Sequence, residues 1–401
     1  MRQHLVDLLD VWQADYQDDW VVAILTHVQG SSYRKPGAIM FFHPLGKTLG
    51  MLSGGCLEAD LRRHAQRAIQ TQQVIQLTYD ATDESDTSYQ LGCGGIVNIM
   101  MLPLTSANHY LGLQKLYHDL NSGKSGEFEI DIVNNGTSAA KVKARWLVKD
   151  KAEQISKTTF VAAKHNAPIS LAICEIDPPD LDTHSDVYNP SSIELSKREA
   201  ISLNLNQAPS KDVKVSLTKT IAAVQSDSAQ CEGHLIIPMS PPIHLGIFGG
   251  GLDAEPIAQI AQTLGWKVTI FDERTAYARQ YDFPRANIMK MPCDAVNGDI
   301  YQSLDAAFVM NHNVSLDAKA LNQLVKFNLG YIALLGPVHR RDRVLHAAQL
   351  CLTDFTGYFS APAGLALGGE LPSSVGLSIL AQCHGILHAS QNISLDKVML
   401  K

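Results

Sequence analysis

The chain has 401 residues, of which 45% are hydrophobic and 18% are charged, and at about 150 residues per domain this composition suggests two packed domains. Lys plus Arg number 33 and Asp plus Glu number 40, for a formal net charge of −7, so a nucleic-acid binder with a basic face is not expected. The seven cysteines are scattered and never spaced as C-x-x-C. They are typical of reduced thiols, and with no apolar run of about 18 residues we expect a cytoplasmic protein without a membrane span.

Apolar segments near the N-terminus predict a helix, three strands and a second helix. Leu5, Leu8, Leu9 and Trp12 fall at helical spacing and indicate an amphipathic opening helix. The further predicted elements are strands at Trp20–Thr26, Ala38–Phe42 and Ile96–Leu104 and a helix from Leu57 to about Gln70. We therefore expect a mixed α+β domain over residues 1–240, with residues 105–240 mostly β.

The pattern changes after Pro241-Pro242, where two prolines end regular structure and mark the expected domain boundary. From there apolar strands alternate with helices. The predicted strands are Ile243–Phe248, Lys267–Phe271, Ala306–Met310 and Tyr331–Leu335, and the helices are Asp253–Leu264, Leu316–Phe327, Arg340–Leu350 and Ser373–Leu387. This alternation predicts an α/β fold, with a Rossmann-like doubly wound parallel sheet over residues 241–401.

A glycine-rich turn joins the first of these strands to its helix. Gly249, Gly251 and Ala254 satisfy G-x-G-x-x-A, which allows a pyrophosphate to approach the helix N-terminus closely. Asp272 ends the next strand, where a carboxylate would hydrogen-bond a ribose hydroxyl. These residues predict NAD(P) binding. Asp253 would place a negative charge near the phosphate, so a scaffold that docks a partner or binds another phosphorylated ligand is an equal alternative.

Two cysteines stand among glycines. Cys56 follows Gly54 and Gly55 at a predicted helix start, and Cys93 precedes Gly94. Glycine leaves a thiol accessible, and a helix N-terminus favours the thiolate, which is a nucleophile and a soft metal ligand. The N–H groups of the first turn could also hold a phosphate. We interpret both cysteines as candidate metal ligands, and the alternative is that the glycines only form turns.

Other polar residues are weaker candidates. Arg34 and Lys35 lie in a glycine loop and would attract an anion, although a solvated turn accounts for them equally well. His312 follows an apolar strand at the carboxyl edge of the predicted sheet, where α/β proteins bind ligands, and a capping role is its alternative. The run His339–Arg341 fits either an anion-binding helix start or a solvated basic turn.

Together these motifs resemble the XdhC/CoxI family, maturation factors of molybdenum hydroxylases such as xanthine dehydrogenase. The segments that carry the resemblance are GSSYRKPGAIM (30–40), LSGGCLEADL (52–61), LGCGG (91–95), IFGGGLDAEPIAQIAQTLGWKVTIFDER (247–274), FPRANI (283–288), NHNVSLD (311–317), YIALLGPVHRRDRVL (331–345) and APAGLALGGELPSSVGLSILAQ (361–382). They cover about residues 20–104 and 243–387. Two departures lie in the second part, where Ser374 replaces the usual glutamate and Asn313 the usual aspartate.

The resemblance implies an accessory protein rather than a catalyst. Such proteins bind the molybdenum cofactor (molybdopterin) while a cysteine desulfurase supplies its terminal sulfido ligand, and then help to insert it into the target molybdenum hydroxylase. On this chain, Cys56 and Cys93 would contact the molybdenum, and the glycine loops with Arg34 would face the pterin phosphate. A thiolate suits a soft, sulfur-bearing metal centre. A homodimer is the expected assembly.

Three functions therefore stay open from the sequence. The first is the molybdenum-cofactor chaperone, which requires the two thiols to converge on a shared cleft. The second is an NAD(P)-dependent oxidoreductase, which rests on the glycine motif and lacks an evident proton donor. The third is a scaffold whose Rossmann domain docks a partner enzyme.

Overall fold

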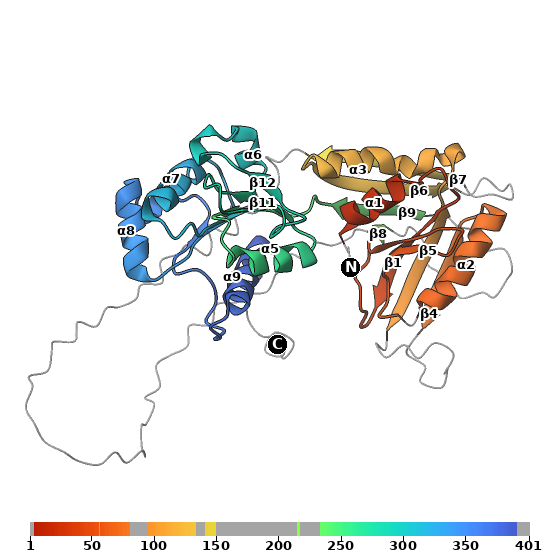
Figure 1. Cartoon of the computed structure of the whole chain (residues 1–401). Helices are drawn as coiled ribbons and strands as arrows, with labels where there is room; N and C mark the ends of the chain where they lie inside the picture. The colour runs from red at the N-terminus through yellow and green to blue at the C-terminus, as the bar shows by residue number, and fades with distance from the viewer. Residues whose placement is uncertain are drawn as a thin grey trace, which may run out of the picture.

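A computed structural model describes residues 4–55, 57–80, 95–133, 141–149, 215–216 and 233–390. They form three β-sheets with helices packed against them (Figure 1). Two antiparallel sheets belong to the part of the chain before residue 240, and a parallel sheet with helices on both faces follows it. The α/β fold with a C-terminal Rossmann-like sheet, which the alternation of strands and helices predicts, is confirmed.

The first sheet has five antiparallel strands in the order β3-β2-β1-β5-β4. Its strands are β1 (Val21–Gln29), β2 (Ile39–Phe42), β3 (Thr48–Gly50), β4 (Ile75–Asp80) and β5 (Ile96–Pro103). Helix α2 (Glu58–Thr71) covers one face, where Leu61 and Ala65 share a hydrophobic core with Ala23 and Ile99 of the sheet. The apolar spacing of this helix matches its burial, as expected for an amphipathic element.

The second sheet is antiparallel in the order β7-β6-β9-β8 and shares a core with the opposite face of the first. Its strands are β6 (Ser125–Val133), β7 (Lys141–Lys149), β8 (Val215–Ser216) and β9 (Gly233–Met239), accompanied by helices α1 (Leu5–Gln13) and α3 (Leu113–Asn121) and the turn η1 (Ser106–Gly112). Trp12, Phe41 and Phe128 belong to this common core. Within it the Trp146 indole N–H donates to Asp119 at 3.0 Å, which satisfies two buried polar groups.

The third sheet has six parallel strands in the order β12-β11-β10-β13-β14-β15. They are β10 (His244–Phe248), β11 (Lys267–Phe271), β12 (Asn287–Met289), β13 (Ala306–Val309), β14 (Tyr331–Leu334) and β15 (Tyr358–Ser360). The order reverses between β10 and β13, as in the Rossmann arrangement. The strands β10, β13 and β14 are buried along their whole length, because helices cover both faces of the sheet.

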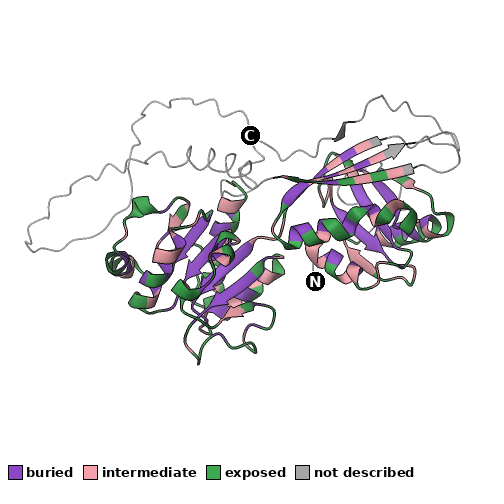
Figure 2. Ribbon diagram, turned by 90° about the horizontal axis from the view of Figure 1, so that it is seen from above, coloured by how far each residue is buried: buried purple, intermediate pink, exposed green. Residues whose placement is uncertain are grey.

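The helices of this domain divide between the two faces of the sheet (Figure 1). One face carries α5 (Ala254–Thr263) and α9 (Pro372–Leu387), and the other carries α6 (Gly298–Gln302), α7 (Val314–Leu324) and α8 (Val338–Ala348), with short 3-10 turns η2 (Cys293–Ala295) and η3 (Leu352–Asp354). Each face has its own hydrophobic core. Figure 2 shows the buried strands between helices whose outer sides are exposed.

Among the described residues, a linker and a contact of the first helix connect the parallel sheet to the rest of the protein. Residues 240–243 link β9 to β10. In addition, the start of α1 contacts the turn after α5, since a Cβ built on Gly265 would lie 3.0 Å from the Cβ of His4. Burial there lowers the pKa of His4, against a smaller opposing effect of Asp7, and its Nδ1 accepts the Val6 N–H at 3.2 Å.

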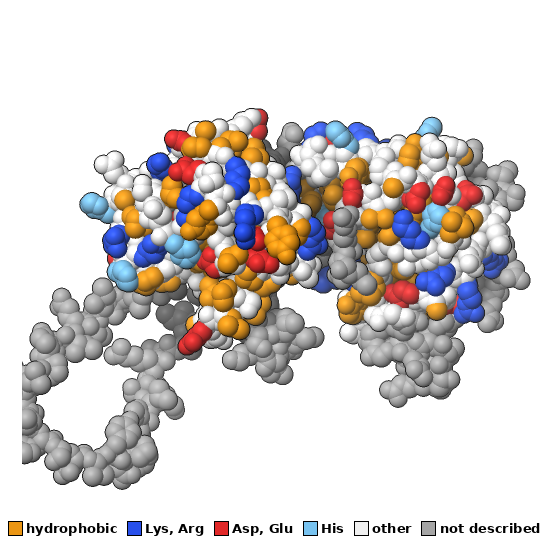
Figure 3. Space-filling view, viewed as in Figure 1, with side chains coloured by type: hydrophobic (Ala, Val, Ile, Leu, Met, Phe, Trp, Pro, Cys, Tyr) orange, Lys and Arg blue, Asp and Glu red, His pale blue; other side chains and the backbone are white. Residues whose placement is uncertain are grey.

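Charged side chains are dispersed over the face shown in Figure 3, where Lys and Arg alternate with acidic and apolar groups. This distribution is in keeping with the formal net charge of −7. Among the helices of the described residues, none combines the length and the hydropathy that crossing a bilayer requires.

Candidate functional site

A cleft of about 440 Å³ opens at the carboxyl edge of the parallel sheet. It adjoins the loops that follow β10, β13, β14 and β15, beside the point where the strand order reverses. Open α/β sheets bind their ligands at this position. The apolar walls include Ile257, Met310, Leu335, Pro362, Val375 and Ile379, and the polar side chains are Asp253, His312 and Glu370.

The glycine motif forms the expected strand–turn–helix connection at one side of this cleft. Gly249 has φ +118°, and a Cβ there would lie 2.5 Å from the carbonyl oxygen of Met310, so only glycine fits. Gly251 is approached by the side chain of Asp253 alone, whose Oδ1 lies 2.6 Å from an ideal Cβ position. Ala254 is buried at the start of α5. The placement of these residues follows the motif, and their cofactor role stays a prediction.

Asp272 immediately follows β11, and its carboxylate is fully committed to the protein, with the Arg274 backbone N–H as one of its donors at 3.0 Å. It accepts hydrogen bonds from Nε and Nη2 of Arg274 at 2.8 and 2.7 Å and from the Gly250 N–H at 2.8 Å. Burial alone would raise the pKa of Asp272, but these hydrogen bonds outweigh burial and lower it. The adjacent hollow measures only about 20 Å³, which is room for about one water molecule. A ribose therefore finds neither a free carboxylate nor space here.

A second carboxylate occupies the N-terminus of α5. Asp253 Oδ2 lies 2.7 Å from Nε2 of His312, which follows β13, and Asp253 makes no capping hydrogen bond with its own helix. His312 adopts φ +56°, a backbone region that residues other than glycine rarely enter. The pair thus places a negative group where a dinucleotide would put its pyrophosphate.

The ends of the strands in the first sheet bring segments from the N-terminal motifs to one side of the sheet. Loop 30–37 connects β1 to β2, β3 ends at Gly50 just before the turn at Ser53, and Ile96 at the start of β5 pairs with Gln29 at the end of β1. A Cβ on Gly95 would lie 2.2 Å from the carbonyl oxygen of Ser31, so the chain entering β5 rests on loop 30–37. Gly95 therefore packs on the loop that carries the half-buried Arg34, and Gly50 of β3, which pairs with Met40, lies at the same end of the sheet.

The turn before α2 is held by Ser53 and Glu58. The Ser53 hydroxyl donates to Glu58 at 2.6 Å and accepts the N–H groups of Gly55 and Leu57 at 3.2 and 3.1 Å. This arrangement resembles a helix capping box and fixes the turn. Gly54 and Gly55 are exposed. The Gly55 N–H donates to Ser53, so this group is already paired within the turn.

The two cysteines and one of the glycines predicted to bind the cofactor, Cys56, Cys93 and Gly94, lie outside the described residues. The convergence of the two thiols on one cleft stays a prediction. What the structure provides is the position of Gly50, at the end of β3, and of Ile96, at the start of β5, at the same end of the sheet. The strands β3 and β5 are three steps apart in the sheet, which corresponds to about 15 Å.

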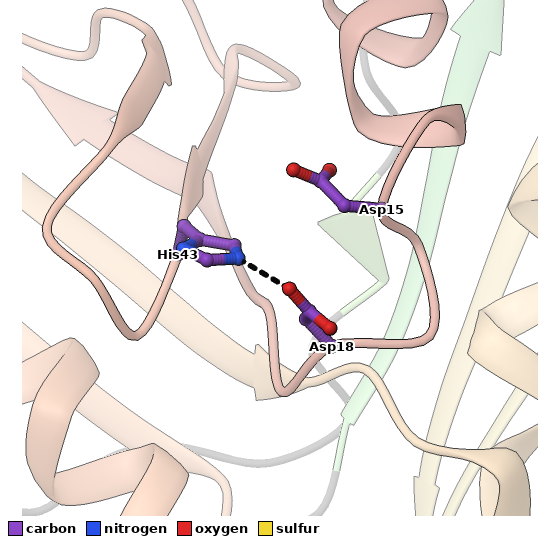
Figure 4. Close-up of side chains that lie close together, drawn as sticks. All are labelled: Asp15, Asp18 and His43. Carbon is purple, nitrogen blue, oxygen red and sulfur yellow. Dashed lines mark hydrogen bonds and ion pairs between the residues drawn. The ribbon is translucent and has the colours of Figure 1, made fainter.

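Sequence analysis missed a cluster at the opposite edge of this sheet, formed by Asp15, Asp18 and His43 (Figure 4). One oxygen or nitrogen atom from each lies within 4.8 Å of the others. The His43 Nδ1 accepts the Leu45 N–H at 3.1 Å, so Nε2 carries the proton that it shares with Asp18 at 2.8 Å. A protonated Nε2 cannot bind a metal. We therefore interpret the cluster as a structural tie between the start of β1 and the end of β2.

Comparison with known proteins decides the family. The model of the XdhC and CoxI family matches residues 14–80, and that of the XdhC Rossmann domain matches residues 245–383. The chain belongs to the XdhC and CoxI family. The two matched segments contain the turn at Ser53 and the cleft of the parallel sheet, so both regions described above are family features.

Two known proteins are similar to this chain over nearly its whole length. A Bacillus subtilis (strain 168) protein, named as a probable subunit of xanthine dehydrogenase, is 26% identical over 381 residues, which covers 94% of this chain and 95% of the relative. A crystal structure from Bacillus halodurans, described as a xanthine dehydrogenase, has a TM-score of 0.64 at 24% identity and covers 98% of each chain. The similarity to the Bacillus halodurans structure shows that the two chains share a fold.

Proposed function

We propose that this XdhC/CoxI family member is an accessory factor of a xanthine dehydrogenase-type molybdoenzyme. In this proposal it binds the molybdenum cofactor as cargo, holds it while a cysteine desulfurase installs the terminal sulfido ligand, and inserts it into the enzyme. The observation that supports it best is the packing of Gly95 on loop 30–37, at the same end of the first sheet as Gly50 of β3. A protein of this kind would act in the cytoplasm, as a homodimer.

The residue roles follow from the chemistry of the cargo. Cys56 and Cys93 would contact the molybdenum as thiolates, because sulfur ligands suit a soft metal centre. Gly54, Gly55 and Gly94 would allow a large ligand to approach the backbone, and Arg34 would face the pterin phosphate. The hydrogen bonds between Ser53 and Glu58 support this proposal, since they hold the turn that leads to α2.

An NAD(P)-dependent oxidoreductase is not favoured by the parallel sheet. Asp253 places its carboxylate at the N-terminus of α5, and Asp272 is paired with Arg274. Both features act against a bound dinucleotide, although Gly249, Gly251 and Ala254 have the expected positions. Docking of a partner enzyme by this domain stays a prediction, which a pull-down with the full chain would test.

The cofactor role is tested by mass spectrometry of small molecules released from protein purified from a molybdenum-replete host. We expect molybdopterin with the natural protein and at least about tenfold less with the double variant Cys56→Ala/Cys93→Ala, because two metal contacts are lost. Cys351→Ala is the matched control, since Cys351 is an exposed cysteine of the other domain. Equal recovery from the double variant and the control would contradict the role of the two thiols.

A further inference from the structure

The cleft of the parallel sheet has a lining unlike that of a nucleotide site. Its volume of about 440 Å³ suits a small organic molecule. Its walls are mostly apolar side chains, and its polar side chains are Asp253, His312 and Glu370. Within the described part of the chain, no Lys or Arg lines it. The two carboxylates thus offer hydrogen-bond acceptors to a ligand, and no Lys or Arg side chain among the described lining residues offers it a positive charge.

The guanidinium of Arg340, close to the cleft, is committed elsewhere. Arg340, in the first turn of α8, packs over Gly336 at the edge of the cleft, where a glycine Cβ would meet its Cδ at 2.4 Å. Its Nη2 is paired with the buried carboxylate of Asp317. An anionic ligand would have to break that pair to gain a counter-charge, which would leave Asp317 buried and unpaired.

The Asp253 carboxylate is held in place at the mouth of the glycine turn. His312 fixes its Oδ2 at 2.7 Å, and its Oδ1 lies over Gly251. A carboxylate has about four lone-pair sites, so Asp253 can still accept hydrogen bonds from a ligand. A phosphate bound at this helix N-terminus would lie beside the carboxylate, and the repulsion of like charges at about 4 Å would weaken binding by about tenfold or more.

We propose that the cleft binds a phosphate-free nitrogen heterocycle that carries an amino group, such as an aminopurine. Its flat ring would pack between the apolar walls, and its amino and ring N–H groups would donate to Asp253 and Glu370. A carboxylate accepts two adjacent N–H groups in a bidentate manner, which gives both strength and direction. This site is separate from the cofactor site proposed for the first sheet, and neither proposal depends on the other.

The direct test titrates guanosine as the probe into the full-length protein by isothermal titration calorimetry, because its ring N1–H and its 2-amino group are adjacent donors. We expect binding of this probe. Inosine, which keeps the ring N–H and lacks only the amino group, should bind about tenfold less tightly, because one N–H···carboxylate hydrogen bond is lost. The 5′-monophosphate of the probe should also bind about tenfold more weakly than the nucleoside. NADH should give no thermal shift at millimolar concentration.

Variants separate this proposal from a general loss of structure. Asp253→Asn should weaken binding of the probe and at the same time reduce the penalty for binding its 5′-monophosphate. Misfolding cannot produce these two opposite effects. Glu370→Gln should weaken binding of the probe and leave the penalty for its 5′-monophosphate unchanged. Glu255→Gln is the matched control, because Glu255 lies in the same first turn of α5 but outside the cleft lining. The proposal is overturned if no probe binds at millimolar concentration, or if the monophosphate or NADH binds the natural protein as tightly as the nucleoside.

Discussion

Asp272 and Arg274 form an ion pair that fixes the glycine turn from the side of β11. The Asp272 side chain is fully buried, whereas that of Arg274 is 27% exposed and packs over the Tyr277 ring with its guanidinium carbon 3.7 Å from the ring centroid. Arg274 also donates to the carbonyl oxygen of Asn311, after β13, at 3.1 Å. A carboxylate that loses its cation in such a place keeps its desolvation penalty without compensation. The pair therefore stabilises the fold.

Replacing Arg274 tests this structural role. We expect Arg274→Met to lower the free energy of unfolding by about 3 kcal/mol at neutral pH, because Asp272 is left buried and unpaired. Urea denaturation measures the change. The control variant Arg279→Met removes an exposed arginine from its ion pair with Asp282. We expect it to lower the free energy of unfolding by less than about 1 kcal/mol. If the two variants lower the free energy of unfolding equally, the Asp272 ion pair stabilises the fold no more than an exposed ion pair does.

The pH dependence of the same pair has a definite sign. The pKa of Asp272 is lowered in the folded protein, so the carboxylate stabilises the fold at neutral pH, and this contribution disappears as the pH falls from about 4 through the folded-state pKa. Asp272→Asn, which removes the titrating group, should reduce the dependence of stability on pH in that acidic range. An unchanged dependence would contradict the assignment.

At the scale of elements, the glycine turn offers a contrast between two neighbouring residues. A Cβ on Gly250 would lie 2.4 Å from the Cβ of Ala278 and 2.7 Å from its backbone, because the segment after β11 packs on the turn. A Cβ on Gly251 would meet only the flexible tip of Asp253. We therefore expect Gly250→Ala to cost about 2 kcal/mol or more. Gly251→Ala should cost less than about 1 kcal/mol, as thermal denaturation of both variants would show.

The elements that sequence analysis located are those with a strong local signal. The strands β10, β13 and β14 are continuous apolar runs, and α5 begins at a glycine turn, so pattern and burial agree. The edge strands β12 and β15 have only three residues each, and α6 has five, so none of them produces a clear period. They depend on packing against neighbours that are distant in the sequence.

The candidate sites show the same division between local and tertiary information. The strand–turn–helix geometry at Gly249 was predictable, because glycine spacing carries it. The pairing of Asp253 with His312 was not, because 59 residues separate the two side chains. The strand order of the sheet brings the ends of β10 and β13 together, and the sequence alone does not specify that order. Asp272 pairs with Arg274, which is only two residues away in the sequence. The glycine motif nevertheless indicates that Asp272 binds a ribose, so the ion pair was not predicted.

At the scale of the whole molecule, the two parts of the chain are joined by the linker 240–243 and by the contact of His4 with Gly265. His4 has two tasks there. Its Nδ1 accepts the Val6 N–H and caps α1, and the half-buried residue lies against Gly265 in the turn after α5. A half-buried histidine whose pKa is lowered at such a joint makes the stability of the protein depend on pH.

The sign of this dependence follows from the lowered pKa of His4. In the unfolded chain a histidine takes up its proton near pH 6.5, whereas folded His4 resists protonation. The unfolded state thus binds more protons as the pH falls, and stability decreases below about pH 6.5. His4→Asn keeps a side chain that caps helices well but cannot titrate. We expect urea denaturation to show a smaller loss of stability from pH 7.5 to pH 5.5 for His4→Asn than for the natural protein. The exposed His339 provides the control His339→Asn, which should retain the full loss; if His4→Asn retains it as well, His4 does not control the pH response of this joint.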